Sequence, residues 1–222
     1  ILLTDGYLAN GAEPWRLPDV STLPDISVEF QTEPNGDNDT FLPYLRDEET
    51  LARPWAIPGT PGLEHRVGGL EKQEITGNVS YDPDNHERMT HLRQAKIDGI
   101  ANDIEPAEYH RNGDADTLIV GWGSTHGSIT AAIGVLAADG VVADHLHLTH
   151  MAPMAPNVAD ALSGYDHVLV PELNMGQLVK ILRADYLVDA RSTAGPSRVH
   201  HCPAASICAD EGVSISMPAA RS

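Results

Sequence analysis

The alternation of strands, glycine turns and helices over residues 82–189 constrains the fold of this chain more than any other feature. The apolar run at 117–120 predicts a buried strand, and the glycine turn at 121–124 leads into a helix at 129–138 that Gly140 closes. Further strands are expected at 141–148, 168–170 and 186–188, with helices at 157–162 and 175–184. Such alternation is typical of a parallel sheet with helices on both faces. The sequence therefore predicts an α/β fold with a small, doubly wound parallel sheet.

A long helix is expected to open this domain. Asp82 is a typical N-cap, and Pro83 suits the first helical position because an N–H there has no helical partner. Met89, Leu92 and Ile100 then recur at helical spacing. The domain is therefore predicted to begin at residue 82.

Residues 1–61 show neither a helical nor a strand period. They hold eight of the 16 prolines and 11 acidic residues against three arginines. A stretch of this length without regular structure indicates disorder, a lid or an arm that wraps a partner. Disordered segments are poor in aromatic residues, whereas this stretch contains Trp15, Phe30, Phe41, Tyr44 and Trp55. A long irregular arm that wraps a partner is the favoured interpretation.

The composition excludes several classes of protein. The chain has 14 basic and 32 acidic residues, a formal net charge of -18, so nucleic-acid and anionic membrane partners are not expected. No apolar run approaches the roughly 20 residues that a membrane span needs. Two cysteines, Cys202 and Cys208, supply neither a disulfide framework nor the four thiolates of an iron–sulfur cluster. A cytoplasmic protein is expected.

The turn after residue 120 is a candidate site, because backbone N–H groups can bind an anion where a parallel strand gives way to a helix. Its candidate residues are Gly121, Gly123, Ser124 and Thr125. His126 stands where the dinucleotide fingerprint has its third glycine, and no phosphate-loop lysine follows. A tight turn with packing glycines is the favoured alternative.

A second strand-to-helix switch, after residue 170, offers Glu172, Asn174 and Gln177 at the carboxyl edge of the predicted sheet. These side chains could contact a ligand or a neighbouring subunit. The alternative is helix capping by Asn174 with Glu172 in solvent. Both interpretations stay open.

Three histidines mark the predicted strand at 141–148. His145 and His147 share one face, because alternate residues of a strand do, and His150 lies just beyond its end. A metal site would need a nearby carboxylate or another histidine, and Asp144 points to the opposite face. Partly exposed strand histidines are therefore favoured, and no metal site is assigned.

The glycine-rich loop at residues 59–70 is shaped for specific turns. It carries His65 and Arg66, which could meet an anionic substrate or coenzyme. The loop could equally serve only to join the arm to the domain.

Several motifs resemble the alpha subunit of the 2-oxoacid:ferredoxin oxidoreductases, above all the two-subunit 2-oxoglutarate enzymes that form succinyl-CoA. The resemblance covers residues 1–189 and is carried by the motifs at 3–11, 58–72, 77–83, 121–124, 147–148 and 170–178. It implies that residues 1–81 are the end of a pyrimidine-binding domain with a connecting arm, and that 82–189 are a transketolase C-terminal-like domain. Because Ile1 opens an apolar run, a C-terminal fragment of such a subunit is expected.

The resemblance also implies a mechanism that uses thiamine diphosphate, with CO2 released, electrons passed to ferredoxin through an iron–sulfur cluster, and the acyl group transferred to CoA. It places the diphosphate, the magnesium ion and the cluster mainly in a beta subunit, and the catalytic glutamate before Ile1. No catalytic residue is assigned here, and the fragment alone is expected to be inactive and to bind none of these cofactors. The candidate residues, His65 and Arg66 included, are then interface or cofactor-proximal positions.

Residues 190–222 depart from the family pattern. They contain no Leu, Phe, Tyr, Trp or Lys and are rich in Ala, Ser and Pro, so they can contribute little to a core. An exposed, disordered tail is predicted, and a reading-frame slip near residue 192 is one hypothesis for its origin.

Two other functions stay open. A non-catalytic assembly module could bind the partners of such a complex through the acidic arm. The strand–helix alternation and the acidity also suit a flavodoxin-like electron carrier, although the turn at Gly121 lacks a Ser/Thr-rich phosphate loop. The sequence distinguishes neither 2-oxoglutarate from pyruvate nor one oligomeric state from another.

Overall fold

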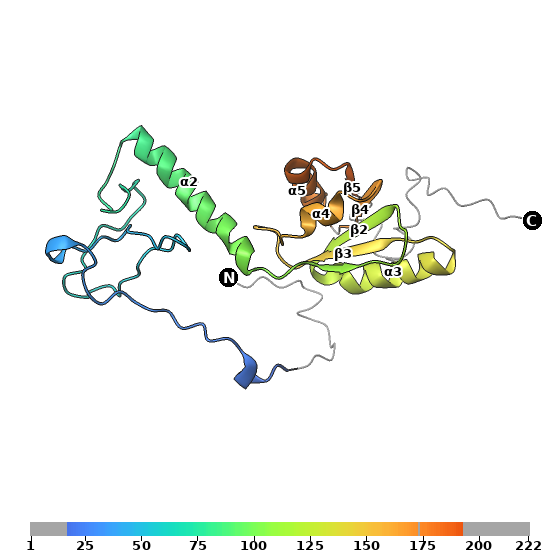
Figure 1. Ribbon diagram of the computed structural model, residues 1–222, viewed down its shortest axis with the longest axis horizontal. Coiled ribbons are helices and arrows are strands. Elements are labelled where there is room, and N and C mark those ends of the chain that lie inside the picture. Colours follow the sequence, from blue (N-terminus) through green and yellow to red (C-terminus); the bar gives the residue numbers. More distant parts are fainter. Residues whose placement is uncertain (1–16, 173, 193–222) are drawn as a thin grey trace, which may run out of the picture. The chain divides into compact units, whose positions relative to one another are not determined.

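The computed structural model describes residues 17–172 and 174–192 of the 222-residue chain, and Figure 1 shows its ribbon. The chain divides into two compact units. The first consists of Ile1–Arg46 with Arg53–Ser80, and the second of Asp47–Ala52 with Tyr81–Ser222.

The described part of the first unit is irregular, as the sequence predicts for a long arm. Its regular elements are two single-turn 3₁₀ helices, η1 (Val20–Thr22) and η2 (Asp37–Asp39). Isolated bridges join Tyr44 to Ile75 and Lys72 to Val79. Local polar contacts hold the glycine-rich loop, because the buried Nζ of Lys72 donates to the carbonyl oxygens of Gly68 and Leu70 at 3.1 and 2.5 Å.

After residues 47–52, the second unit resumes at Tyr81 with the long helix α2 (Pro83–Gly99), and the 3₁₀ helix η3 (Ile100–Asp103) follows it directly. Asp82 is the N-cap, and its carboxylate accepts a hydrogen bond from the backbone N–H of Asp84 at 3.0 Å. The predicted cap and first-turn proline are therefore confirmed. None of the described helices is long and apolar enough to span a bilayer.

Five strands form one sheet in the order β1-β3-β2-β4-β5. Their bounds are β1 Glu108–His110, β2 Thr117–Trp122, β3 Asp144–Leu148, β4 His167–Val170 and β5 Ala190–Ser192. Strands β2, β3, β4 and β5 pair in parallel, whereas β1 pairs antiparallel with β3 at one edge.

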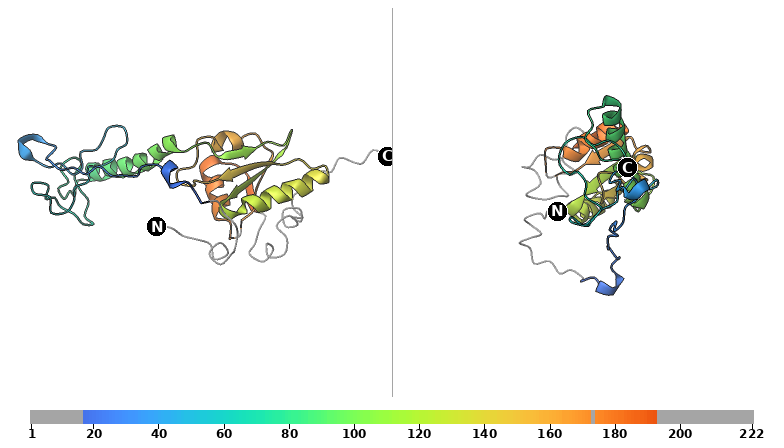
Figure 2. Two further views of the ribbon diagram at one scale, coloured as in Figure 1. Left: turned by 90° about the horizontal axis from the view of Figure 1, so that it is seen from below. Right: turned by 90° about the vertical axis from the view of Figure 1, so that its left-hand side faces the viewer.

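Helices cover both faces of the sheet, as Figure 1 shows and as Figure 2 shows from two further directions. On one face, α4 (Val158–Leu162) and α5 (Gln177–Tyr186) bury the larger core. On the other face, α3 (His126–Ala138) packs over Ile119 of β2. The residues of β2 alternate between these two cores because successive strand residues point to opposite faces. The predicted doubly wound α/β fold is confirmed.

The predicted strand at residues 186–188 is wrong. Tyr186 ends α5, and Leu187 takes a left-handed conformation (φ 55°) with its side chain in solvent. The chain then re-enters the sheet at β5, where the buried Ala190 pairs with Val168. The predicted tail therefore begins with a paired strand, and its remaining residues, 193–222, lie outside the described part of the chain.

Two further differences concern β3 and β1. The strand predicted at 141–148 begins only at Asp144. Strand β1 was not predicted, because three residues with a polar, half-exposed pattern are too short to show a period.

Candidate functional site

The turn between β2 and α3 is packed from within. A Cβ atom added to Gly121 would lie 2.3 Å from Cδ1 of Ile129, so a larger residue here would force the Ile129 side chain to move. Gly123 has a positive φ of 58°. The Thr125 hydroxyl accepts from the N–H of Trp122 at 3.1 Å and donates to its carbonyl oxygen at 2.8 Å. This geometry supports the tight packing turn, while an interface contact by the exposed Ser124 stays a prediction.

The turn between β4 and α5 is built around a buried carboxylate. Glu172 is 1% exposed, so the alternative in which it lies in solvent is wrong. Its two oxygens accept from the backbone N–H groups of Leu178 and Val179 at 2.9 and 3.1 Å. A helix begins with N–H groups that have no partner within the helix, and these groups provide the donors that a buried carboxylate requires.

Asn174 completes this turn. Its Nδ2 donates to Glu172 at 3.0 Å, and its Oδ1 accepts from the N–H groups of Gly176 and Gln177 at 2.8 and 2.9 Å. The predicted capping by Asn174 is therefore confirmed, and the Gln177 side chain is exposed. Because protein groups already satisfy these four N–H groups, the turn offers little to an external anion.

His65 and Arg66 belong to the first unit and are both exposed. Nδ1 of His65 lies 2.8 Å from the carbonyl oxygen of Leu63, and its ring meets Phe41 edge-on at 5.2 Å between centroids. These contacts fix the loop locally, so a role for either residue toward a ligand stays a prediction.

Histidines and one glutamate gather on the face of the sheet that α3 covers. The register pairs Glu108 of β1 with His147 of β3, and His110 with His145. Paired residues of neighbouring strands point to the same face, and α3 adds its first residue, His126. We call these five residues the histidine cluster.

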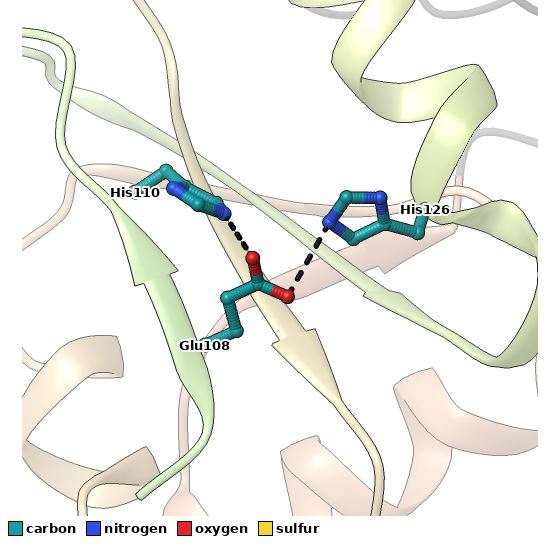
Figure 3. A group of neighbouring side chains, drawn as sticks. All are labelled: Glu108, His110 and His126. Carbon is teal, nitrogen blue, oxygen red and sulfur yellow. Dashed lines mark hydrogen bonds and ion pairs between the residues drawn. The ribbon is translucent and has the colours of Figure 1, made fainter. Parts of the chain in front are cut away.

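Glu108 connects two of the histidines, as Figure 3 shows. Its Oε1 lies 2.6 Å from Nε2 of His110, and its Oε2 lies 3.4 Å from Nε2 of His126. The hydrogen bond to His110 lowers the pKa of Glu108, and electrostatic interaction with the neighbouring His110, His126 and His147 lowers it further. Glu108 is therefore ionised at neutral pH.

The two β3 histidines are held uncharged at neutral pH. Burial, and then the neighbouring His147, His126 and His110, lower the pKa of His145 to about 4. Burial also lowers the pKa of His147, although its hydrogen bond to the Gly123 carbonyl oxygen at 3.2 Å opposes this shift. Three ring nitrogens in the cluster are buried without a hydrogen bond from any described residue: Nε2 of His126, Nε2 of His145 and Nδ1 of His147.

Sequence reasoning found only part of this cluster. It placed His145 and His147 on one face, as observed. Its expectation that they are partly exposed is wrong, because both are buried. The carboxylate judged to be missing is Glu108, which an unpredicted antiparallel strand supplies. The signal was present in the alternate spacing of Glu108 and His110, which on its own gives no strand register. His150 is exposed and pairs with its neighbour Thr149 instead.

A pocket of about 640 Å³ lies at the amino ends of β2 and β4, away from all of the predicted site residues. Tyr165 lines it and donates a hydrogen bond to the buried carboxylate of Asp144. Burial and this bond raise the pKa of Tyr165. The pocket is therefore lined by a neutral phenol that donates a hydrogen bond to the first residue of β3.

Comparisons with known proteins agree on one class, the alpha chains of 2-oxoacid-oxidising enzymes. No family model matches the chain. The 2-oxoglutarate oxidoreductase subunit KorA of Mycobacterium tuberculosis is 50% identical over 193 residues, which are 86% of this chain and 29% of that protein. The alpha subunit of 2-oxoacid:ferredoxin oxidoreductase 1 of Aeropyrum pernix is 30% identical over 190 residues, 82% of this chain and 29% of that protein.

A solved structure gives the same answer. The 2-oxoglutarate:ferredoxin oxidoreductase of Magnetococcus marinus, with 2-oxoglutarate, coenzyme A and succinyl-CoA bound, matches with a TM-score of 0.62 at 29% identity. The match covers 74% of this chain and 29% of that chain.

Over the matched residues, the chain is a relative of the 2-oxoacid:ferredoxin oxidoreductase alpha subunits, and the resemblance stated from the sequence is confirmed. The chain spans about 29% of the length of these relatives.

Proposed function

We propose that this chain forms part of the alpha subunit of a 2-oxoglutarate:ferredoxin oxidoreductase. The complete enzyme would convert 2-oxoglutarate and CoA to succinyl-CoA and CO2, with two electrons passed singly to ferredoxin. The observation that carries this proposal is the 50% identity to the Mycobacterium tuberculosis subunit over 86% of the chain. The relative of solved structure supports the choice of substrate, because it holds 2-oxoglutarate and succinyl-CoA.

The chemistry of such an enzyme needs thiamine diphosphate with magnesium and an iron–sulfur cluster, and we place these groups outside the described residues. Neither strand-to-helix turn fits a diphosphate, since Glu172 and Asn174 occupy the N–H groups at α5 and packing fills the turn at Gly121. The chain has two cysteines, fewer than the four that a cluster requires. A beta subunit is the proposed holder of both groups.

The role proposed for the second unit is architectural. Side chains satisfy the N–H groups of the turn before α5, and the turn before α3 is closely packed around Gly121, so both turns support the sheet rather than bind a substrate anion. The interface or cofactor-proximal positions Gly123, Ser124 and Gln177 then face neighbouring parts of the complex. A cytoplasmic location stays a prediction.

The arm is proposed to bind the beta subunit. Residues 17–30 carry large apolar side chains that are 45–86% exposed: Leu17, Val20, Leu23, Ile26, Val28 and Phe30. Contiguous exposed apolar surface is typical of interaction sites. A double variant, Val20→Asp with Ile26→Asp, is expected to weaken co-purification with the beta subunit, whereas the exposed control Thr32→Asp is expected to leave it intact.

The activity is tested on the complete gene product that contains residues 1–222, expressed together with a beta subunit. We expect reduction of ferredoxin that requires both 2-oxoglutarate and CoA. The proposal would be contradicted if the assembled pair failed to reduce ferredoxin with every 2-oxoacid supplied. Assembly without turnover would instead favour a non-catalytic assembly module, which the satisfied turns of the second unit also suit.

A further inference from the structure

The histidine cluster contains a group of atoms with the composition of a metal site. One carboxylate oxygen of Glu108 and one ring nitrogen each of His110 and His126 lie within 4.8 Å of one another. They come from two elements, β1 and α3, and converge on the same space (Figure 3). Two imidazoles and a carboxylate are a ligand set that zinc accepts, with a fourth position left for water.

The distances are close to those that an ion would require. Ligand atoms at 2.0–2.2 Å from a tetrahedral zinc ion lie about 3.3 Å from one another. Nε2 of His126 is already 3.4 Å from Oε2 of Glu108. Nε2 of His110 is 2.6 Å from the other carboxylate oxygen, Oε1, so this pair would open by less than about 1 Å for both atoms to bind the ion.

A second observation, independent of the spacing, comes from the buried nitrogens. Nε2 of His126 is buried and makes no hydrogen bond with a described residue, although it faces an ionised carboxylate. Behind it, His145 is 2% exposed and also leaves its Nε2 without a partner. Buried polar atoms normally have hydrogen-bond partners, so two imidazole nitrogens without a hydrogen bond, gathered at one place, indicate a ligand.

The electrostatics favour a cation over an anion. The chain has a formal net charge of -18, which attracts cations to it. Imidazole nitrogens select ions such as zinc, whereas magnesium and calcium prefer oxygen ligands.

We propose that Glu108, His110 and His126 bind one zinc-class divalent ion that ties the edge strand β1 to the start of α3. The three-residue strand β1 is otherwise held to the sheet by its pairing with β3 alone among the described strands. The ion adds a link on the face that α3 covers, and its open fourth position takes water. This site is separate from the oxidoreductase activity proposed above.

The test uses the full chain after treatment with a chelator and its removal. Zinc binding is measured by calorimetry, and Co2+ is added in parallel because its visible spectrum reports ligand type and geometry. We expect one zinc ion per chain, no binding of Mg2+, and a tetrahedral Co2+ spectrum without a thiolate charge-transfer band. A thiolate band would place the ion at Cys202 or Cys208 and would overturn the proposal.

Variants locate the ion. Loss of an outer partner of a metal ligand typically lowers affinity 10–100-fold, so Glu108→Gln and His126→Phe, which remove ligands, are each expected to lower zinc affinity by about 100-fold or more. The matched control is His91→Phe on α2, which removes a histidine that lies 3.9 Å from Glu87 in an exposed pair. This variant is expected to bind zinc as the parent does.

Three results would overturn the proposal: no zinc binding, binding unchanged by the ligand variants, or binding lost equally in the His91 control. If circular dichroism shows that His126→Phe does not fold, the result for Glu108→Gln decides the test. The Glu108 side chain is half-exposed, so its replacement does not disturb the hydrophobic core.

Discussion

The turn before α5 and the histidine cluster at the start of α3 are both polar, and both lie beside the same sheet. At α5, two side chains satisfy four backbone N–H groups, and the buried Glu172 has donors on both oxygens. In the histidine cluster, three buried ring nitrogens find no hydrogen-bond partner among the described residues.

The difference separates a structural network from a candidate site. A buried polar network with all partners present contributes to stability and leaves nothing for a ligand. Unpaired buried nitrogens cost free energy unless another species binds them. For Glu172 and Asn174, which the sequence left open between a site and a cap, the contacts favour a structural role, and the histidines that were set aside are the better candidates.

The largest effect is expected from Glu172→Ala. Removal of the carboxylate leaves the N–H groups of Leu178 and Val179 buried without acceptors, and we expect a loss of about 3 kcal/mol in unfolding free energy. Urea denaturation measures it. The exposed Glu105→Ala is the control and is expected to stay within about 0.5 kcal/mol. Equal unfolding free energies for the two variants would contradict a structural role for Glu172.

The next effect concerns pH in the metal-free protein. The pKa of His145 is about 4 in the folded chain and about 6.5 in an unfolded one. The unfolded chain therefore binds more protons between these values, and stability falls as the pH drops from 6.5 to 4. We expect a loss of about 2 kcal/mol between pH 7 and pH 4.

His145→Phe tests the source of this pH dependence, because phenylalanine keeps a ring and removes the titration. Urea denaturation in EDTA at both pH values should show a smaller loss in this variant than in the parent. The exposed His150→Phe serves as the control, with the parent's pH dependence unchanged. A parent whose stability does not change over this range would contradict the account.

Gly121→Ala is expected to cost about 1–2 kcal/mol, because the added Cβ would meet Ile129 at 2.3 Å. Gly134→Ala in the middle of α3 is the matched control, since nothing lies within 4 Å of its added Cβ. That variant is expected to gain about 0.5–1 kcal/mol from helix propensity. Thermal denaturation of both proteins gives the sign of each change.

Asn174→Ala is expected to have the smallest effect, about 1 kcal/mol of lost stability. It removes the acceptor for the N–H groups of Gly176 and Gln177 and the Nδ2 donor to Glu172, but leaves the bonds from the N–H groups of Leu178 and Val179 to Glu172 in place. Hydrogen exchange at the first turn of α5 would show this local loosening, and unchanged exchange would count against the capping role.

The sequence predicted the parallel strands and their helices because apolar periodicity and caps are local signals. Asp82 and Gly140 show this at the ends of helices, where both predictions hold. Strand β5 was misplaced because Leu187 and Val188 look more strand-like than Ala190, although the left-handed Leu187 prevents a strand there.

The histidine cluster could not be predicted in full, because it depends on the register of an antiparallel edge strand. Glu108 and its pair His147 are far apart in the sequence, and no local pattern shows which residues of two strands face each other. The buried state of Glu172 was missed for a related reason, since its partners lie six and seven residues ahead in a helix turn.

The difference between the turn around Glu172 and the histidine cluster is tested most directly by a zinc-edge anomalous difference map. The crystals would contain the full chain, grown with one equivalent of zinc. We expect one peak within about 2.2 Å of the ligand atoms of Glu108, His110 and His126, and none at the turn around Glu172. A map without a peak at the histidine cluster would contradict it.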